Sequence, residues 1–322
     1  MTINIILFLV GLLMLYYGAE WLVRGSSSLA GSLGMQPIVI GLTVVAFGTS
    51  APELVVSLVS SMKGKSMIAV GNIIGSNICN IALVLGMTAL FQPIKCHPSV
   101  FKRDIPIMLG ITFYLLIVSG NSFISRLEGA SLVAAIIVYI YYNYRVATRT
   151  SCDKTAAMPC DVTEIRPVGN RYKQIALILA GIAGVVIGAE VLIDSAVKIM
   201  TVFGVSDKFI GLTIVAFGTS LPELATSVIA ALKKEMDISL GNLVGSNVFN
   251  ILAVLGAAAL VNPITIPGGF IASGLFIDYM VMTAVSAIPL FMIRKTYTVS
   301  RLDGVVLLST YGGYLAYLIM KS

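Results

Sequence analysis

Residues 41–94 read GLTVVAFGTSAPELVVSLVSSMKGKSMIAVGNIIGSNICNIALVLGMTALFQPI, and residues 211–264 read GLTIVAFGTSLPELATSVIAALKKEMDISLGNLVGSNVFNILAVLGAAALVNPI. The two stretches align without a gap, and about half of their positions are identical. The shared residues include Gly, Thr, Ser, Pro, Glu and Asn, which an apolar segment tolerates least, so composition does not explain the match. The sequence therefore indicates an internal duplication, and its matched polar clusters are where we look for chemistry.

The rest of the chain is strongly apolar. Hydrophobic residues make up 57% of it and charged residues 11%, whereas about a quarter of the residues are charged in ordinary soluble domains. Apolar runs of about 20 residues recur along the chain, which is typical of a protein that crosses the lipid bilayer several times. The net charge of +6 comes mainly from Lys and Arg between these runs, so it does not indicate nucleic-acid binding.

The few residues that bind soft metals show no ligand pattern. The single histidine, His97, lies in a connection and has no metal-site spacing to any cysteine. Nothing suggests a disulfide framework, and we expect no cofactor. The cysteines of the central connection are simplest as free thiols on a reducing side. The four cysteines are Cys79, Cys96, Cys152 and Cys160.

Hydropathy predicts an all-α fold of ten membrane-spanning helices. An odd number of helices in each half means that the second half crosses the membrane in the opposite direction, which gives two inverted five-helix repeats. Most of the 21 Lys and Arg residues fall on the side of the long connection, which places that connection in the cytoplasm and both termini outside the cell membrane. The predicted helices lie near 3–23, 36–62, 67–91, 104–120, 125–144, 173–200, 207–232, 237–261, 270–293 and 302–320. The predicted parts are 1–146 (first repeat), 147–172 (cytoplasmic loop) and 173–322 (second repeat).

A cluster of polar residues interrupts the second predicted helix. It reads GTSAPE at 48–53, and GTSLPE repeats it at 218–223 in the seventh helix. Proline removes an N–H group and clashes with the preceding turn, so we expect a break that frees main-chain carbonyls near Ala46 and Thr49. Glu53 and Glu223 add two carboxylates, which are costly in hydrocarbon unless something compensates their charge.

A second cluster lies in the third and eighth helices, as GNIIGSNICN at 71–80 and GNLVGSNVFN at 241–250. Ser76 and Asn80 are four residues apart and share a helix face, as do Ser246 and Asn250. We expect helices two, three, seven and eight to be discontinuous.

The assembled groups are carboxylate, hydroxyl, amide and carbonyl oxygens. These hard donors suit Ca²⁺ or Na⁺ and do not suit Zn²⁺ or Cu⁺. Each Ser, Thr or Asn taken alone is explained equally well as a contact between helices. The two glutamates are not, because no Lys or Arg falls within either core motif. Glu20 and Glu190, at matched Gly-Ala-Glu positions, favour a structural or gating role, and Glu20 can pair with Arg24 one turn later.

With these residues in view, the chain resembles the cation/calcium exchanger superfamily, and most closely its compact prokaryotic sodium/calcium exchangers. The four signatures quoted above carry the resemblance, and the predicted ten-helix plan extends it over essentially the whole chain. It implies Ca²⁺ and Na⁺ as transported ions, bound at mid-membrane between helices two, three, seven and eight. It also implies that helices one and six slide across this core to alternate access.

The resemblance also assigns roles to the motif residues. Glu53 and Glu223 are expected to bridge Ca²⁺, with main-chain carbonyls from Thr49 and Thr219. Some family members carry Asp where this chain has Asn250, and here both Asn80 and Asn250 are amides, which argues against a potassium requirement. We include both amides among the candidate ligands. The residues expected to complete the flanking Na⁺ sites are Ala46, Ser50, Ser76, Ala216, Ser220 and Ser246.

These features predict a secondary antiporter, acting as a monomer, in which Na⁺ and Ca²⁺ compete for the same two carboxylates. A Ca²⁺/H⁺ antiporter on the same scaffold is the main alternative, because adjacent carboxylates also hold protons. The many Ser, Thr and Asn oxygens favour Na⁺ sites instead. An intramembrane hydrolase is disfavoured, since the sequence offers no paired-Asp motif and no Ser/His dyad, so we do not expect an enzyme.

Overall fold

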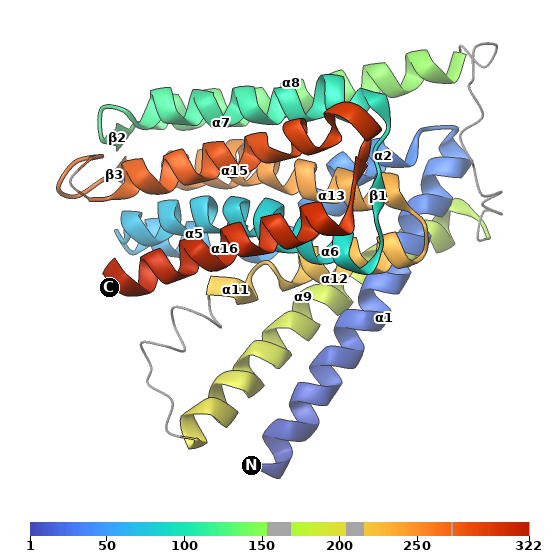
Figure 1. The fold of residues 1–322 in the computed structure, drawn as a ribbon, viewed down its shortest axis with the longest axis horizontal. Coiled ribbons are helices and arrows are strands. Elements are labelled where there is room, and N and C mark those ends of the chain that lie inside the picture. Colours follow the sequence, from blue (N-terminus) through green and yellow to red (C-terminus); the bar gives the residue numbers. More distant parts are fainter. Residues whose placement is uncertain (153–168, 204–215, 272, 322) are drawn as a thin grey trace.

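The computed structural model describes residues 1–152, 169–203, 216–271 and 273–321, which form a bundle of long helices with short connections (Figure 1). The first half begins with one long helix, continues through a broken one, and ends with an antiparallel pair. Its elements are α1 (Thr2–Leu33), α2 (Pro37–Ile40), the π-helical η1 (Gly41–Val45), α3 (Ala46–Thr49), α4 (Ala51–Met62), α5 (Ser66–Ile78), the π-helical η2 (Cys79–Leu85), α6 (Gly86–Phe91), the π-helical η3 (Val100–Asp104), α7 (Ile105–Ser119) and α8 (Arg126–Cys152).

The second half repeats this order where it is described. Its elements are α9 (Arg171–Val202), α11 (Ala216–Gly218), α12 (Leu221–Leu232), α13 (Met236–Phe249), the π-helical η5 (Asn250–Leu255), α14 (Gly256–Val261), α15 (Leu275–Thr296) and α16 (Arg301–Lys321). The predicted loop 147–172 starts later than expected, because no Pro or Gly ends α8 before Cys152. Cys160, most of that loop and the start of the predicted seventh helix lie outside the described residues.

Two short antiparallel ribbons join the halves at their ends, a feature that the all-α prediction omits. In one, β1 (Ile94–Lys95) pairs with β4 (Thr298–Val299), and in the other, β2 (Phe123–Ile124) pairs with β3 (Ile264–Thr265). Each ribbon takes one strand from each half, so the connections at the helix ends are tied across the molecule.

Helix length and composition support a chain that crosses the membrane several times. In the described part of the chain, six helices are long and apolar enough to cross a membrane, and a bent pair raises the number to seven. The predicted multi-pass helical fold is confirmed to this extent, whereas ten spans in inverted repeats stay a prediction. Two of the remaining helices are short, since α7 has 15 residues and α12 has 12, against about 20 for a full crossing.

The predicted break in the second helix is present. Helices α3 and α4 meet at Ser50 with a bend of 47°, because Pro52 stands in the first turn of α4 and cannot continue the preceding hydrogen-bond ladder. The third and eighth helices are not broken, contrary to the prediction. There the helix continues without a sharp bend but widens into η2 and η5, since no proline forces a break and an inserted π turn suffices to redirect side chains.

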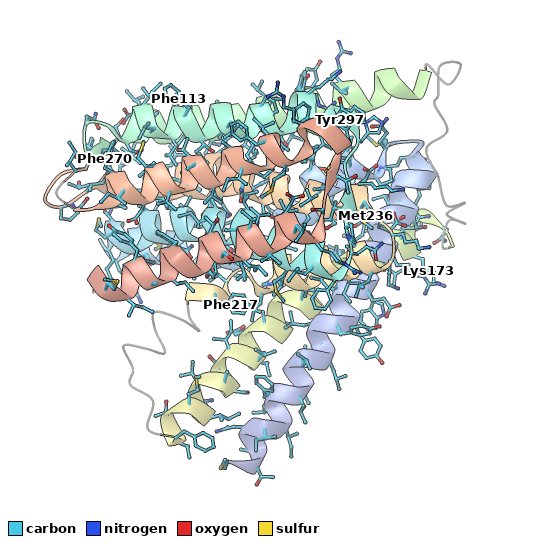
Figure 2. All side chains as sticks on the ribbon, viewed as in Figure 1. Phe113, Lys173, Phe217, Met236, Phe270 and Tyr297 are labelled. Atoms are coloured by element: carbon cyan, nitrogen blue, oxygen red, sulfur yellow. The ribbon has the colours of Figure 1, made fainter. Side chains whose placement is uncertain are left out.

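Helices α1 and α9 form a pair that crosses the outside of the bundle (Figure 1). Glycines hold them backbone to backbone: a Cβ on Gly18 would lie 2.6 Å from Val185 N, and one on Gly181 would lie 2.5 Å from Leu22 N. Small residues allow this close approach. Side chains project outward along both helices (Figure 2), and apolar residues such as Leu9 are exposed there, as expected of a surface that faces lipid.

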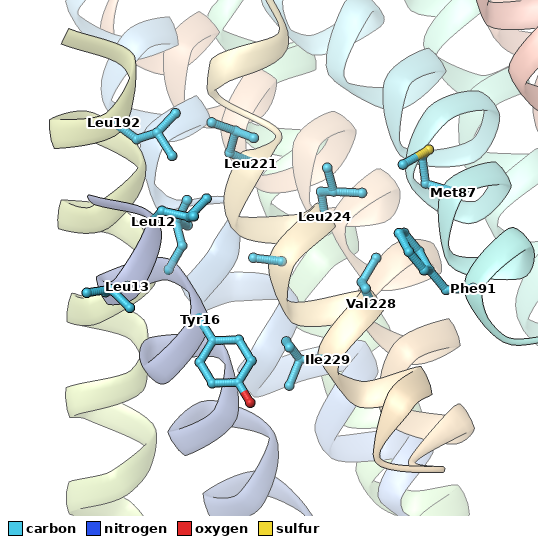
Figure 3. A pocket seen from close by; sticks show the side chains of 12 residues that line it. Leu12, Leu13, Tyr16, Met87, Phe91, Leu192, Leu221, Leu224, Val228 and Ile229 are labelled. Atoms are coloured by element: carbon cyan, nitrogen blue, oxygen red, sulfur yellow. The ribbon is translucent and has the colours of Figure 1, made fainter. Parts of the chain in front are cut away.

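The α1–α9 pair is not packed tightly against the bundle everywhere. An apolar cavity of about 550 Å³ lies between the pair and helices α12 and α6 (Figure 3). Leu12 and Tyr16 of α1 line one side of it, and Leu224 of α12 and Phe91 of α6 line the other. The most buried spans are the two that carry η2 and η5, so the core of the molecule is where the sequence places its amides.

Candidate ion-binding site

The two glutamates lie in equivalent places at the centre of the molecule. Glu53 stands in the first turn of α4 and Glu223 in the first turn of α12, and neither side chain is exposed to solvent. Each follows a proline that starts the helix, so each carboxylate sits at the positive end of a helix dipole. The two carboxylates are close enough to repel each other. Each half of the molecule therefore contributes one buried carboxyl group to a single locus.

Within the described part of the chain, no basic side chain forms an ion pair with these acids. The ion pairs within the described residues are Arg103–Asp104 and Lys233–Glu20, and neither involves the central carboxylates. Ser50 Oγ donates a hydrogen bond of 3.2 Å to Glu223 Oε1. Both oxygens of Glu53 and the second oxygen of Glu223 are buried without a hydrogen-bond partner. Two carboxylates buried in this way are costly without a cation, which makes this pocket a candidate cation site.

Hydroxyl groups surround the two carboxylates from both halves. Ser76 of α5 and Thr219, next to the second break, face Glu53. Thr49 and Ser246 face Glu223, and Thr49 Oγ1 also donates to Asn242 Oδ1 at 2.9 Å. The predicted hydroxyl ligands are thus brought together. The hydroxyls of Ser76, Thr219 and Ser220 are buried without a partner.

The main-chain carbonyl of Ala46 is not freed as the sequence predicts. Ala46 is buried, but its carbonyl accepts the Ser50 N–H at 3.0 Å and is not freed by the break. Pro52 lacks the N–H group that would bond to the carbonyl of Gly48, two residues further along, so the carbonyl of Ala46 keeps its partner. In the second half, the N–H of Ser220 donates to Phe217 O at 3.2 Å and does not reach back to Ala216. The side chain of Ala216 lies outside the described part.

Asn80 and Asn250 lie on the π-helical segments η2 and η5, which pack against the glutamate helices α12 and α4 respectively. The amide nitrogen of Asn80 donates to Asn247 Oδ1 and that of Asn250 donates to Asn77 Oδ1, each at 3.1 Å. The side-chain oxygens of Asn80 and Asn250 are buried without a partner. The sequence placed both amides correctly at the core, but it did not identify Asn77 and Asn247 as their partners, although both recur in the duplication.

A further pair of amides, Asn72 and Asn242, belongs to the predicted polar clusters but not to the predicted ligands, and it supports the main chain of the glutamates. Asn72 Nδ2 donates to Ser57 Oγ at 3.0 Å and to the main-chain oxygen of Glu53 at 3.4 Å. Asn242 makes the same two bonds, at the same distances, to Ser227 and Glu223. The signal was available in the sequence, since both asparagines follow a glycine at matched positions. These bonds fix the first turn of each glutamate helix to the neighbouring helix.

Helix α9 covers both breaks. A Cβ on Gly48 would collide with Ile182, and one on Gly218 would collide with Ile193. These isoleucines are about three helical turns apart, so they project from one face of α9. The two motif glycines are therefore needed to let the outer helix pair approach the site.

Glu20 does not make its predicted bond to Arg24. It pairs with Lys233 at the end of α12, where Nζ and Oε1 are 2.7 Å apart. Lys233 reaches it because α1 packs against α12.

Soft-metal chemistry has no place in this geometry. The described residues contain no group of three His, Cys, Asp or Glu side chains that could hold a metal ion. The donors are two carboxylates with neutral hydroxyl and amide oxygens, which suits hard cations. Together with the multi-pass helices, this arrangement is typical of a membrane protein that transports cations.

Comparisons with known proteins identify the family to which the chain belongs. The chain belongs to the sodium/calcium exchanger protein family, whose model matches residues 3–145 and 173–320. It is 32% identical to the sodium/calcium exchanger MaX1 of Methanosarcina acetivorans, over 98% of this chain and 99% of the relative. It is 36% identical to the inner membrane protein YrbG of Escherichia coli (strain K12), over 98% and 95%.

Solved structures show the same fold. The sodium-calcium exchanger NCX_Mj, soaked with Na⁺ and Ca²⁺, superposes with a TM-score of 0.81 at 32% identity and 98% coverage of both chains. The predicted family is thereby confirmed, and the chain is a prokaryotic-type cation/Ca²⁺ antiporter of the membrane.

Proposed function

We propose that this chain exchanges Na⁺ for Ca²⁺ across the cell membrane by alternating access. The observation that carries the proposal is a set of buried oxygens that have no hydrogen-bond partner. Buried polar atoms are almost always paired, and unpaired oxygens that surround two carboxylates fit cations as the missing partners. These oxygens belong to Glu53, Ser76, Asn80, Thr219, Ser220, Glu223 and Asn250.

Charge balance explains why the two ions are exchanged. Glu53 and Glu223 bring a charge of about −2 into a low-dielectric centre, which one Ca²⁺ or two Na⁺ neutralise. Because both ions need the same carboxylates, binding of one displaces the other. The empty site retains two buried charges without partners, so crossing the membrane empty is disfavoured and transport is coupled.

The candidate ligands have distinct parts in this proposal. Glu53 and Glu223 bind Ca²⁺ with oxygens from Thr49 and Thr219. Ser50, Ser76, Ser220 and Ser246, with the main chain at Ala46 and Ala216, form flanking Na⁺ sites. Asn80 and Asn250 contribute neutral oxygens, which argues against a need for K⁺. The main-chain carbonyl of Ala46 contributes only a second lone pair, since it already accepts one bond.

Transport in proteoliposomes tests the choice of driving ion. Vesicles loaded with Na⁺ and diluted into Na⁺-free buffer with radiolabelled Ca²⁺ are expected to accumulate Ca²⁺, and K⁺ inside them is expected to be ineffective. A proton gradient without Na⁺ is the matched control. Uptake driven by the proton gradient alone would establish the Ca²⁺/H⁺ alternative and would contradict the proposal.

The arrangement in the membrane belongs to the same proposal. We infer ten helices in two inverted repeats, 1–146 and 173–322, with both termini outside, the connection 147–172 in the cytoplasm, and a functional monomer. Thiol labelling of intact cells at Cys152 or Cys160, alone in a background without other cysteines, tests the orientation. Labelling by a membrane-impermeant reagent only after the cells are opened is expected, and labelling of intact cells would reverse the orientation.

A further inference from the structure

Two amide hydrogen bonds cross between the halves beside the site. Asn250 Nδ2 donates to Asn77 Oδ1, and Asn80 Nδ2 donates to Asn247 Oδ1. All four side chains are at most 1% exposed. Each candidate ligand amide is therefore held by an asparagine from the other half.

These bonds decide which atom of each ligand amide is left unbonded: the nitrogens are occupied, and the oxygens have no partner. An asparagine side chain carries an oxygen that accepts hydrogen bonds and a nitrogen that donates them, and a cation can bind only the oxygen. The nitrogen of Asn77 donates to the main-chain oxygen of Asn247 at 3.3 Å, so the oxygen of Asn77 is turned to Asn250. The nitrogen of Asn247 lies 3.6 Å from Met108 Sδ, which turns its oxygen to Asn80.

We propose that Asn77 and Asn247 are positioning residues for ion binding, because they fix the amides of Asn250 and Asn80 with their oxygens toward the ion pocket. Without its partner, a ligand amide can rotate by half a turn and present N–H groups to the cation. The inference rests on the proposed function of the central pocket. It applies equally whether Na⁺ or H⁺ drives the exchange.

A double-mutant cycle tests this role through the ligand itself. Asn77→Ala is expected to raise the Ca²⁺ concentration for half-maximal transport by about tenfold, the effect of one lost hydrogen bond to a critical group, with the maximal rate retained. Asn250→Asp presents an oxygen in either orientation. In that background, Asn77→Ala is expected to change the half-maximal concentration by less than about twofold.

The duplication supplies a matched control. In the Asn80→Asp background, Asn77→Ala is expected to keep its full effect, because Asn80 is held by Asn247. The mirror variant Asn247→Ala is expected to be rescued by Asn80→Asp and not by Asn250→Asp. Equal effects of Asn77→Ala in all backgrounds, or no effect in any, would contradict the proposal. The cycle compares variants that all transport Ca²⁺, so a negative result in it concerns only the positioning role. Failure of the proposed function would instead appear as a wild-type protein that transports no Ca²⁺.

A second inference comes from the ion pair at one end of the molecule. Lys233 at the end of α12 holds Glu20 of α1 at 2.7 Å, and nearby Ser27 Oγ donates to Glu235 Oε1 at 2.7 Å. These contacts fasten the α1–α9 pair to the second half of the bundle.

The duplication contains the two residues of this ion pair a second time. Glu190 of α9 corresponds to Glu20, and Lys63 at the end of α4 corresponds to Lys233. Both residues are exposed, and neither takes part in an ion pair within the described residues. In inverted repeats these two residues belong to the opposite side of the membrane.

We infer that the two pairs form alternately: Glu20–Lys233 fastens the outer helices in the arrangement seen here, and Glu190–Lys63 fastens them in the opposite one. This inference rests on the proposed alternating access. Because α1 and α9 contact each other through backbone, they move as one body, and breaking one pair brings the other together.

Reversible cross-linking tests the alternation. In a cysteine-free background, Glu20→Cys with Lys233→Cys and, separately, Glu190→Cys with Lys63→Cys are treated with a short thiol-cleavable cross-linker. Both pairs are expected to cross-link and to stop Ca²⁺ transport until a reductant is added. Glu20→Cys with Lys63→Cys is the mismatched control and is expected not to react. Failure of the Glu190–Lys63 pair to cross-link in a protein that transports Ca²⁺ would overturn the inference.

Discussion

The two copies of the motif carry the same groups but engage them differently. Thr49 and Ser50 in the first half make hydrogen bonds to Asn242 and Glu223, whereas the hydroxyls of Thr219 and Ser220 have no partner. In contrast, Asn72 and Asn242 make equivalent bonds at equal distances. The bonds that support the glutamate helices are thus symmetric, and those that line the pocket are not. Near-identical sequences here hold the same motif in two local arrangements, which agrees with the alternating access proposed above.

Neutralising either glutamate gives the largest expected effect. Glu53→Gln and Glu223→Gln are each expected to reduce Ca²⁺ transport by at least about 100-fold, because each removes half of the charge that binds the ion in a low-dielectric centre. Glu53 has no hydrogen-bond partner, so Glu53→Gln is also expected to raise the melting temperature of the ion-free protein. Exchange retained in either variant would contradict the site, and transport assays with thermal unfolding measure both effects.

The contact between α1 and α9 gives the next effect, since it couples the two halves. Gly181→Ala places a methyl group against the backbone of Leu22, and overpacking of this kind costs about 1–3 kcal/mol. We expect a lower melting temperature and slower transport. Gly31→Ala, also in α1, is the control, because nothing lies within 4 Å of its Cβ position. It is expected to be neutral or stabilising, and an equal loss from both variants would show that the close contact is unimportant.

The different hydrogen bonding of Thr49 and Thr219 can be measured as a difference in the free energy of unfolding. Thr49→Val leaves Asn242 Oδ1 buried without its donor, which costs about 1–3 kcal/mol. Thr219→Val breaks no hydrogen bond and is expected to change stability by less than about 0.5 kcal/mol. Thermal unfolding of both variants without Ca²⁺ provides the measurement. Equal destabilisation would mean that the two hydroxyls are equivalent in the resting protein.

Sequence reasoning predicted the features that depend on local chemistry. Pro52 dictates the break in its helix, and the matched acids do come together in the core. That these acids bind a cation stays a prediction. The widening of the helix at Asn80, in place of a break, could not be predicted, because a π turn depends on packing in three dimensions. The partners of the amides were missed for a similar reason. Asn77 touches Asn250 only across the repeat interface, and no spacing along the chain encodes that contact.

The ion pair of Glu20 also depends on a tertiary contact that spacing along the chain does not encode. Proximity in sequence favoured Arg24, but tertiary packing supplies Lys233. The duplication held the relevant signal, since Glu20 and Lys233 both recur at matched positions, as Glu190 and Lys63. Comparing one copy with the other therefore predicts more than reading either copy alone.

The smallest expected effect is that of pH on the arrangement in which Glu20 pairs with Lys233. Glu235 lies in the connection after α12, where burial raises its pKa above the ordinary value, the hydroxyl of Ser27 lowers it in part, and the charge of Asp237 raises it further. If the α1–α9 pair withdraws, Glu235 becomes exposed and its pKa falls. The arrangement seen here therefore binds the proton more tightly. Acidification through the raised pKa favours this arrangement, and the preference is lost as the pH rises above it.

Cross-linking of the Glu190→Cys and Lys63→Cys pair measures this shift, because that pair reports the opposite arrangement. Its rate is expected to fall by about two- to threefold at mildly acidic pH, which corresponds to a fraction of one pKa unit. Adding Glu235→Gln, which stays neutral, is expected to remove this part of the pH dependence, while the ordinary pH dependence of thiol chemistry persists in both proteins. Asp237 is a second partly buried acid nearby, so Asp237→Asn is the matched comparison. An unchanged pH profile with Glu235→Gln would assign the effect to another group and leave the asymmetry between the two ends independent of protons.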